Sequence, residues 1–365
     1  MSFFTNIFNK GDSYIDNNND FWNWFLDNEK RFFKVVKNRD DIENNFFEEL
    51  SSKLNELKEG FFYQTGMYDD DLAELILTPD GNIKNIVFVE ELIKVAPILP
   101  NWKFTALKRA NNNLAKFSIS MAGYDFHTKN LFFYANEQND YPDEIEIIMV
   151  YEDYDKEDKK MITNACFIFL EELLGELNVA TMIDSLKVVG KAAAEKELVP
   201  IEKLKAYLFW REKEFLEKYE GMRYDTENDS YSILEATLRN GKPLIALINT
   251  TLLKWDCKAS HPWILEFQII YDGENNNGMP IKEEYQKMIN FEEEATKYLQ
   301  DFDGYLDIGR ETADNSREIY FACKEFRKAS KIAYDLIVNH SNGLEIKYHI
   351  YKDKYWQTFE KFGIS

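Results

Sequence analysis

Hydrophobic residues recur every three to four positions near the start of the chain, which is the spacing of one face of a helix. Trp22, Phe25 and Phe32 follow this pattern and predict a helix over residues 20–37. A second pattern of the same kind predicts another helix over residues 40–59. The chain is therefore expected to begin with two amphipathic helices that each bury one face.

The pattern then changes to short stretches typical of strands, separated by turn residues. One further long helix is predicted over residues 156–177. The segment 86–96 fits either a strand or a helix, and a helix is favoured for its second half. The predicted strands of this part are 61–67, 72–78, 102–106, 117–121, 131–134, 145–151 and 182–188.

The last third of the chain combines the two patterns. Asn240-Gly241 lies between two apolar stretches and predicts a hairpin turn. Helices are predicted over residues 281–300 and 325–340. The predicted strands are 232–238, 244–249, 263–269, 305–312, 317–323 and 344–351.

Helices and strand pairs thus alternate irregularly, which predicts the α+β class. We expect two domains, each an antiparallel sheet with packed helices. The N-terminal domain is predicted over residues 1–199 and the C-terminal domain over residues 222–365. Residues 200–221 are predicted to form a connecting helix, which starts beside Pro200.

Composition narrows the classes of function. The 365 residues include 44 Lys and Arg against 65 Asp and Glu, a formal net charge of −21. A chain this acidic repels phosphate backbones, so we expect no direct nucleic-acid binding. No apolar stretch is long enough for a membrane span, and the N-terminus lacks the pattern of a secretory signal, so a cytoplasmic location is expected.

The sequence contains none of the usual nucleotide-binding, hydrolase-elbow or zinc motifs. Cys257 and His261 have a spacing that would suit a thiolate–imidazole pair on a helix, but Pro262 argues against a helix there. No catalytic residue, metal ligand or cofactor is therefore predicted. Clustered carboxylates remain the one feature that would suit a metal-dependent enzyme.

One segment resembles a known family. Gly309, Arg310 and Thr312 precede a turn that is followed by Arg317-Glu318 and aromatic residues. This order, over about residues 222–362, resembles the domain of unknown function 695, which is similar to the regulator of ribonuclease E activity B. Further matches in the same order are Asn277-Gly278-Met279-Pro280, Phe291-Glu292, and Asp353, Trp356 and Phe359.

The resemblance implies a ferredoxin-like α/β sandwich and a regulator that binds protein. Three positions depart from the family pattern: Asn315 replaces a turn glycine, Ala322 an aromatic residue and Ile281 a helix-capping threonine. Asn tolerates positive φ, so the turn is expected to survive.

Candidate binding residues come from this segment. Arg310, Glu318, Tyr320 and Trp356 would form a contact surface, with Arg317 beside the same turn. Arg310 and Arg317 flank the turn, where each could pair with a carboxylate across it. An alternative interpretation is purely structural: Arg317 and Glu318 lie on opposite faces of a strand, and Trp356 closes the core.

The leading hypothesis is a non-enzymatic regulator or inhibitor that binds a protein partner through an acidic surface rich in aromatic residues. A basic partner fits this charge, and a nuclease is one such partner, with the acidic N-terminal half mimicking nucleic acid. The alternatives are a metal-dependent hydrolase using clustered carboxylates and a structural partner in a homo-oligomer. The sequence does not fix the oligomeric state.

Overall fold

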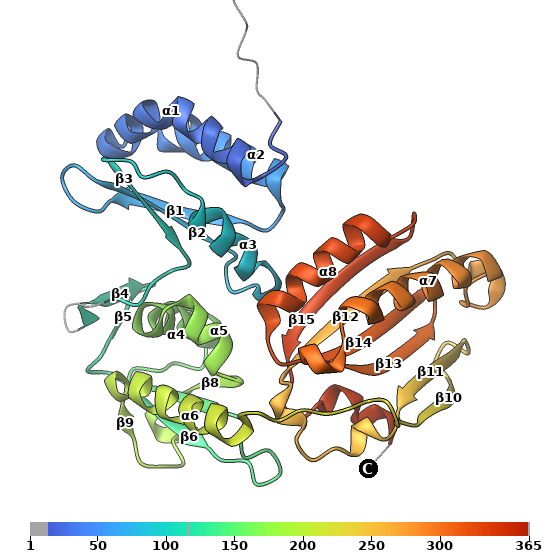
Figure 1. The fold of residues 1–365 in the computed structure, drawn as a ribbon. Coiled ribbons are helices and arrows are strands. Elements are labelled where there is room, and N and C mark those ends of the chain that lie inside the picture. The colour runs from blue at the N-terminus through green and yellow to red at the C-terminus, as the bar shows by residue number, and fades with distance from the viewer. Residues whose placement is uncertain (1–13, 112, 115–116, 364–365) are drawn as a thin grey trace, which may run out of the picture. The chain divides into compact units, whose positions relative to one another are not determined.

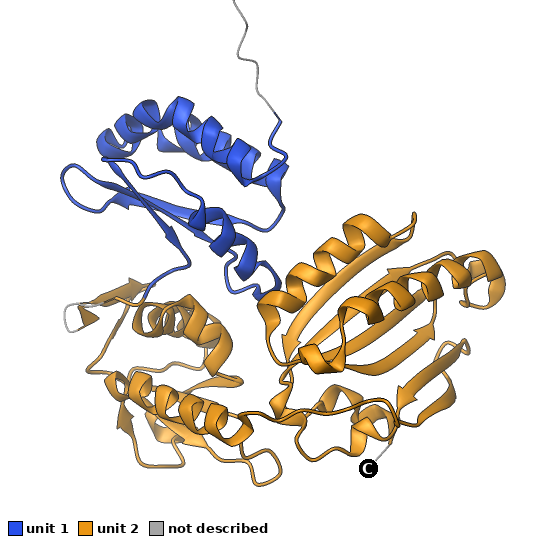
Figure 2. Ribbon diagram, in the orientation of Figure 1, with its two compact units in different colours: residues 1–109 blue, residues 110–365 orange. Residues whose placement is uncertain are grey.

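The computed structural model describes residues 14–111, 113, 114 and 117–363. The chain divides into two compact units, one up to Arg109 and the other from Ala110 onward (Figure 2). The expectation of a cytoplasmic location rests on the first residues of the chain, and residues 1–13 lie outside the part that the structure describes. No helix in the described ranges is long and apolar enough to cross a membrane.

The first unit places its helices against a small sheet (Figure 1). Strands β1 and β2 are antiparallel, whereas β2 and β3 are parallel because helix α3 connects them. The two expected leading helices are present, and a π-helical turn, Glu43–Phe47, precedes the second. The elements are α1 (Asn18–Asn38), α2 (Glu48–Leu57), β1 (Phe62–Met67), β2 (Ala73–Thr78), α3 (Ile83–Lys94) and β3 (Trp102–Ala106).

The second unit begins with what we call the middle lobe, residues 110–221. Its larger sheet has the order β8-β7-β6-β9, with β7 and β8 parallel. The predicted helix 156–177 is divided at Gly175, whose φ of 82° a side chain disfavours. The elements are β4 (Ser118–Met121), β5 (Tyr124–His127), β6 (Leu131–Asn136), β7 (Glu146–Tyr151), α4 (Lys159–Leu174), α5 (Glu176–Met182), β8 (Ser185–Gly190), β9 (Val199–Pro200) and α6 (Leu204–Tyr219).

The rest of the second unit, residues 222–363, is called the C-terminal lobe. Its six-stranded sheet is antiparallel throughout, in the order β10-β11-β13-β14-β12-β15. The expected hairpin joins β10 and β11. The elements are β10 (Tyr231–Thr237), β11 (Pro243–Asn249), β12 (Trp263–Ile270), α7 (Lys282–Tyr298), β13 (Tyr305–Ala313), β14 (Ser316–Cys323), α8 (Phe326–His340) and β15 (Glu345–Lys352).

The two helices of this lobe cover one face of only four strands. Phe291 of α7 packs on Phe267 of β12 with ring centroids 5.3 Å apart, and Phe326 of α8 packs on Trp263 at 4.8 Å. The β10–β11 hairpin continues the sheet beyond α7 (Figure 1). Two helices about 10 Å apart span about four strands spaced 4.8 Å, so the hairpin lies outside their reach.

The α+β class is confirmed, but the parallel pairs β2–β3 and β7–β8 correct the expectation of purely antiparallel sheets. The narrower ferredoxin-like assignment stays a prediction. The units also differ from the predicted domains, because residues 110–221 group with the C-terminal lobe rather than with residues 1–109. Helix α6, predicted as a connector, buries Leu204 and Leu208 in the core of the middle lobe.

Charged groups explain why the two lobes form one unit. Asp184 of the middle lobe pairs with Lys352 and Lys354, each at 2.8 Å. Asp143 of the middle lobe accepts a hydrogen bond from Tyr355 of the C-terminal lobe at 2.6 Å. These contacts fix the end of the sheet at β15 to the middle lobe.

Candidate functional site

A β-bulge in β13 shapes the most distinctive site of the C-terminal lobe. The pairing of β13 with β14 shifts register between Asp307 and Gly309. Gly309 has a φ of 131°, and a Cβ there would lie 2.1 Å from the carbonyl oxygen of Leu247. Only glycine fits this approach to β11, so the bulge depends on the first residue of the family-like segment.

The bulge changes which side chains share a face. Residues three apart in a regular strand point to opposite faces. The extra residue cancels this alternation: Asp307 is opposite Phe321 and Arg310 is opposite Ile319, on alternate and therefore same-face positions of β14. Both charged side chains consequently lie on the face that carries α7.

Glu292 of α7 connects two arginines from different strands. Its carboxylate oxygens lie 2.5 Å from Arg310 Nη1 and 2.9 Å from Arg317 Nη1. Arg317 also donates from Nε to Thr312 Oγ1 at 2.9 Å, and its guanidinium lies over the Tyr285 ring at 4.9 Å. These contacts hold the arginines against the helix, not across the turn as predicted from sequence.

Asp307 lies in a cavity of about 280 Å³ beside this network, which we call the Asp307 cavity. No described cation forms an ion pair with Asp307. Burial, with the charge of Glu292, raises the pKa of Asp307 to about 6, and Arg310 and the Gly309 N–H offset this only in part. The lining residues are Tyr231, Leu247, Ile289, Glu292, Glu293, Thr296, Asp307, Gly309, Arg310, Ile319 and Phe321.

Exposed apolar side chains extend from the cavity over the hairpin. Tyr231, Ile233 and Ile245 are 42%, 68% and 38% exposed, and we call them the β10–β11 ledge. In contrast, Ala246 and Ile248 alternate with them along β11 and are fully buried on the opposite face. Tyr231 belongs both to the ledge and to the lining of the Asp307 cavity, so the two adjoin beside α7, and we call them together the groove along α7.

The predicted binding residues take two different positions. Arg310 is partly exposed and lines the Asp307 cavity, whereas Arg317 is buried behind Glu292. Glu318 and Tyr320 point to the opposite face of the sheet, as their alternation with Arg317 predicts. There Tyr320 donates to Glu311 Oε1 at 2.6 Å, and Lys361 also contacts Glu311.

Trp356 is only 1% exposed and belongs to the core on that opposite face. Its Nε1 donates to the His261 carbonyl at 2.9 Å. Asp353 accepts the backbone N–H groups of Gln357 and Thr358 at 2.8 and 2.9 Å. The buried side chains of Arg317, Tyr320 and Trp356 therefore hold the lobe together, and the five predicted residues do not form one surface.

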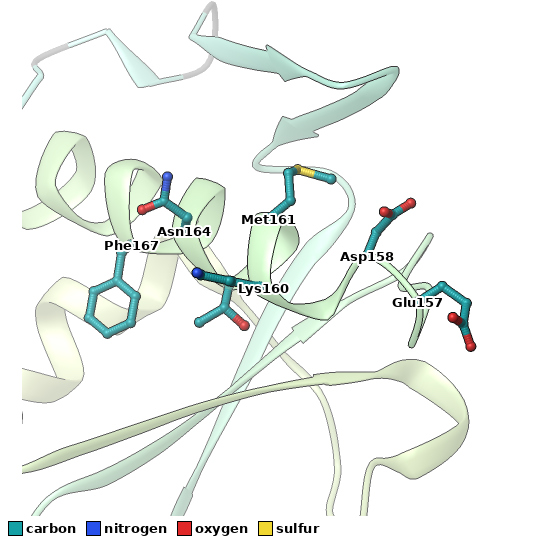
Figure 3. A pocket seen from close by; sticks show the side chains of 7 residues that line it. Glu157, Asp158, Lys160, Met161, Asn164 and Phe167 are labelled. Atoms are coloured by element: carbon teal, nitrogen blue, oxygen red, sulfur yellow. The ribbon is translucent and has the colours of Figure 1, made fainter.

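Other candidates offer less. A wide hollow of about 730 Å³ follows the outer side of α4, where Lys160, Asn164 and Phe167 point outward (Figure 3). Asp158 at its rim already accepts a hydrogen bond from Tyr124 at 2.8 Å. The hollow is open to solvent and brings together no set of reactive groups.

The sequence argues against a thiolate–imidazole pair of Cys257 and His261, and the structure shows the surroundings of His261. His261 is buried, and its Nδ1 lies 2.9 Å from Ser260 Oγ. Burial, with the charge of Lys324, lowers the pKa of His261 to about 3, so the ring is neutral. Among residues 14–363 that are described, no three His, Cys, Asp or Glu side chains come close enough to hold a metal ion.

The comparisons with known proteins agree with the position of the resemblance. Residues 236–362 match the family model described as "Family of unknown function (DUF695)". No curated protein matches the chain, and no solved structure matches it. The match includes α7, β13 and β14, and therefore the bulge, Glu292 and both arginines.

Sequence reasoning missed Asp307 and the role of Gly309. A signal was present: Asp307 is a lone acid between Leu306 and Ile308 in a predicted strand, and glycine follows two residues later. Glycine within a strand indicates a bulge or a close approach of another backbone. The close contact between Leu247 and Gly309 depends on the pairing of β11 with β13, which the hydrophobic pattern of the sequence does not predict.

Proposed function

We propose that the chain is a non-enzymatic regulator whose C-terminal lobe binds a protein partner in the groove along α7. The single observation that carries this proposal is the β10–β11 ledge, an apolar sheet face that no described helix covers. Apolar faces of this kind on a folded chain are typical of interaction sites. We expect the cytoplasmic location from the N-terminal pattern and a nuclease as one candidate for a basic partner from the acidic charge of the chain.

The dimensions of the groove favour an amphipathic helix as the occupant. Two strands provide a width of about 10 Å, which is the diameter of one helix. On the α7 side, Ile289, Glu292, Glu293 and Thr296 line the cavity at helical spacing. A partner helix placed there would continue the layer of α7 and α8, and recognition of a helix in a groove is common.

The metal-dependent hydrolase has no comparable support. It requires several carboxylates that converge on one ion, and the described side chains provide no such group. Asp307 and Glu292 both line the cavity, but Glu292 is already paired with Arg310 at 2.5 Å.

A selection experiment tests the proposed function. The full chain is used to select binders from a displayed library of helical peptides, and hydrogen exchange then maps the peptide on the chain. We expect the selected peptides to protect residues 231–249 and α7, and to lose binding to Ile233→Lys. Val338→Lys is the matched control, since Val338 is an aliphatic residue on α8 with 61% exposure. Protection elsewhere, or equal loss in both variants, would contradict the proposal.

A further inference from the structure

We infer that the Asp307 cavity binds a lysine or arginine side chain of the partner helix, with the cationic group paired to the Asp307 carboxylate. This inference rests on the proposed function, because it specifies the chemistry of the residue that enters the same groove.

The charges around Asp307 favour a cation. Glu292 and Glu293 face the cavity from α7, and Arg310 is the one cation among its lining residues. Both oxygens of Glu292 are used by Arg310 and Arg317, and this cluster of one carboxylate and two guanidinium groups carries a net charge of +1. Asp307 and Glu293 form no described ion pair and add two negative charges, so the five groups together keep a net charge of −1, which favours a cation.

The walls suit the rest of such a side chain. Leu247, Ile289 and Ile319 provide apolar surface around the carboxylate. Lysine and arginine bury their aliphatic stems along apolar surface while the charged end keeps a polar partner. An uncharged apolar residue would cover these walls and leave the Asp307 carboxylate buried without a counter-ion, which costs free energy.

The remaining neighbours of Asp307 allow this pairing. Tyr231 of β10 lines the cavity, and burial, with the charge of Asp307, raises the pKa of Tyr231, so its hydroxyl stays protonated. The facing residues of β11 and β14, Leu247, Ile319 and Phe321, carry no charge. The charged groups that face the bound cation are therefore Asp307, Glu292, Glu293 and Arg310.

The test uses a set of amphipathic peptides of about 18 residues, long enough to form a helix. Each carries a leucine stripe, with Ala and Gln elsewhere, and one guest residue at the border of the stripe: Lys, Arg, Met or Glu. Binding to the full chain is measured at pH 7.5 and pH 5. A control peptide carries its Lys on the polar side, which reports general attraction to the acidic chain.

We expect the Lys and Arg guests to bind at least tenfold tighter than the Met guest at pH 7.5, and the Glu guest to bind more weakly. This gain in affinity over the Met guest should disappear in the Asp307→Asn variant. It should shrink at pH 5, where Asp307 takes up a proton. Equal binding of Lys and Met guests, or a gain that persists in Asp307→Asn, would overturn the inference.

The same peptides separate this inference from the proposed function. If the Met peptide binds and the Ile233→Lys variant does not bind it, the groove binds a helix even when all guest peptides have the same affinity. If no peptide of the set binds, or if Ile233→Lys binds them all as the wild type does, both the groove and its cation site are contradicted.

Discussion

The two edges of the six-stranded sheet differ in what covers them. At one end, β15 packs against α8, and Lys352 at the end of β15 and Lys354 just after it pair with Asp184 of the middle lobe. At the other end, β10 and β11 carry apolar side chains that no described helix covers. A closed end with buried ion pairs is explained by folding, whereas the open apolar end is the feature that the proposed binding of a partner would explain.

The largest change in the free energy of unfolding is expected from a substitution at the closed end. Asp184→Asn removes the partner of Lys354, whose side chain is 2% exposed, and leaves a buried ammonium without its counter-ion. Breaking one side of a buried pair costs about 3–5 kcal/mol. Denaturant unfolding should show this loss, and Glu345→Gln, which breaks an exposed pair on β15, should cost less than about 1 kcal/mol. Similar losses in both variants would contradict the comparison.

The pH dependence of the closed end has a definite sign. Burial disfavours the charge of Asp184, but Lys352 and Lys354 outweigh it, so the pKa of Asp184 lies below its ordinary value. A carboxyl with a lowered pKa stabilises the fold above its unfolded pKa of about 4 and loses that effect as pH falls further. Acid titration of the wild type should show this loss, and Asp184→Asn should lack it.

The second effect concerns the bulge beside the open end. Gly309→Ala places a Cβ against the Leu247 carbonyl and should lower the free energy of unfolding by about 2–4 kcal/mol. Gly343→Ala is the control, because Gly343 also has positive φ but no atom within 4 Å of the added Cβ. It should cost about 1 kcal/mol. If both alanine variants are equally stable, the close approach at Gly309 is not what maintains the bulge.

The third substitution, Asp307→Asn, is expected to stabilise the protein, whereas the two preceding ones destabilise it. Because the pKa of Asp307 is raised to about 6, the folded chain holds this proton more tightly than the unfolded chain does. The contribution to stability is present below about pH 4 and is lost as pH rises to about 6. Asp307→Asn should therefore stabilise the protein by about 2–3 kcal/mol at pH 7.5 and by little at pH 4. A destabilised variant at pH 7.5 would contradict this account of the cavity.

The smallest effect on folding is expected at the ledge itself. Ile233→Lys changes a side chain that is already 68% exposed, so the free energy of unfolding should change by less than about 0.5 kcal/mol. Thermal unfolding of this variant and of Val338→Lys should agree within that margin. A large loss in Ile233→Lys alone would show that Ile233 belongs to the core of the lobe.

Features that depend on neighbouring residues are predicted well from the sequence, whereas contacts between distant residues are not. Local patterns identify the β10–β11 hairpin, the helices of the C-terminal lobe and the opposite orientation of Arg317 and Glu318. They do not show that Glu292 joins Arg310 and Arg317, because that contact links a helix to two strands distant in sequence. The grouping of residues 110–221 with the C-terminal lobe likewise depends on pairs such as Asp184–Lys354, separated by 170 positions.

Position-specific photo-crosslinking in the native cell tests the central claim most directly. A photoreactive amino acid replaces Ile233 in one variant of the full chain and Val338 in another, two exposed positions on opposite parts of the same lobe. The account predicts that one protein is crosslinked from position 233 through a basic helical segment, and that position 338 gives no such product. Equal products from both positions, or none from position 233, would contradict it.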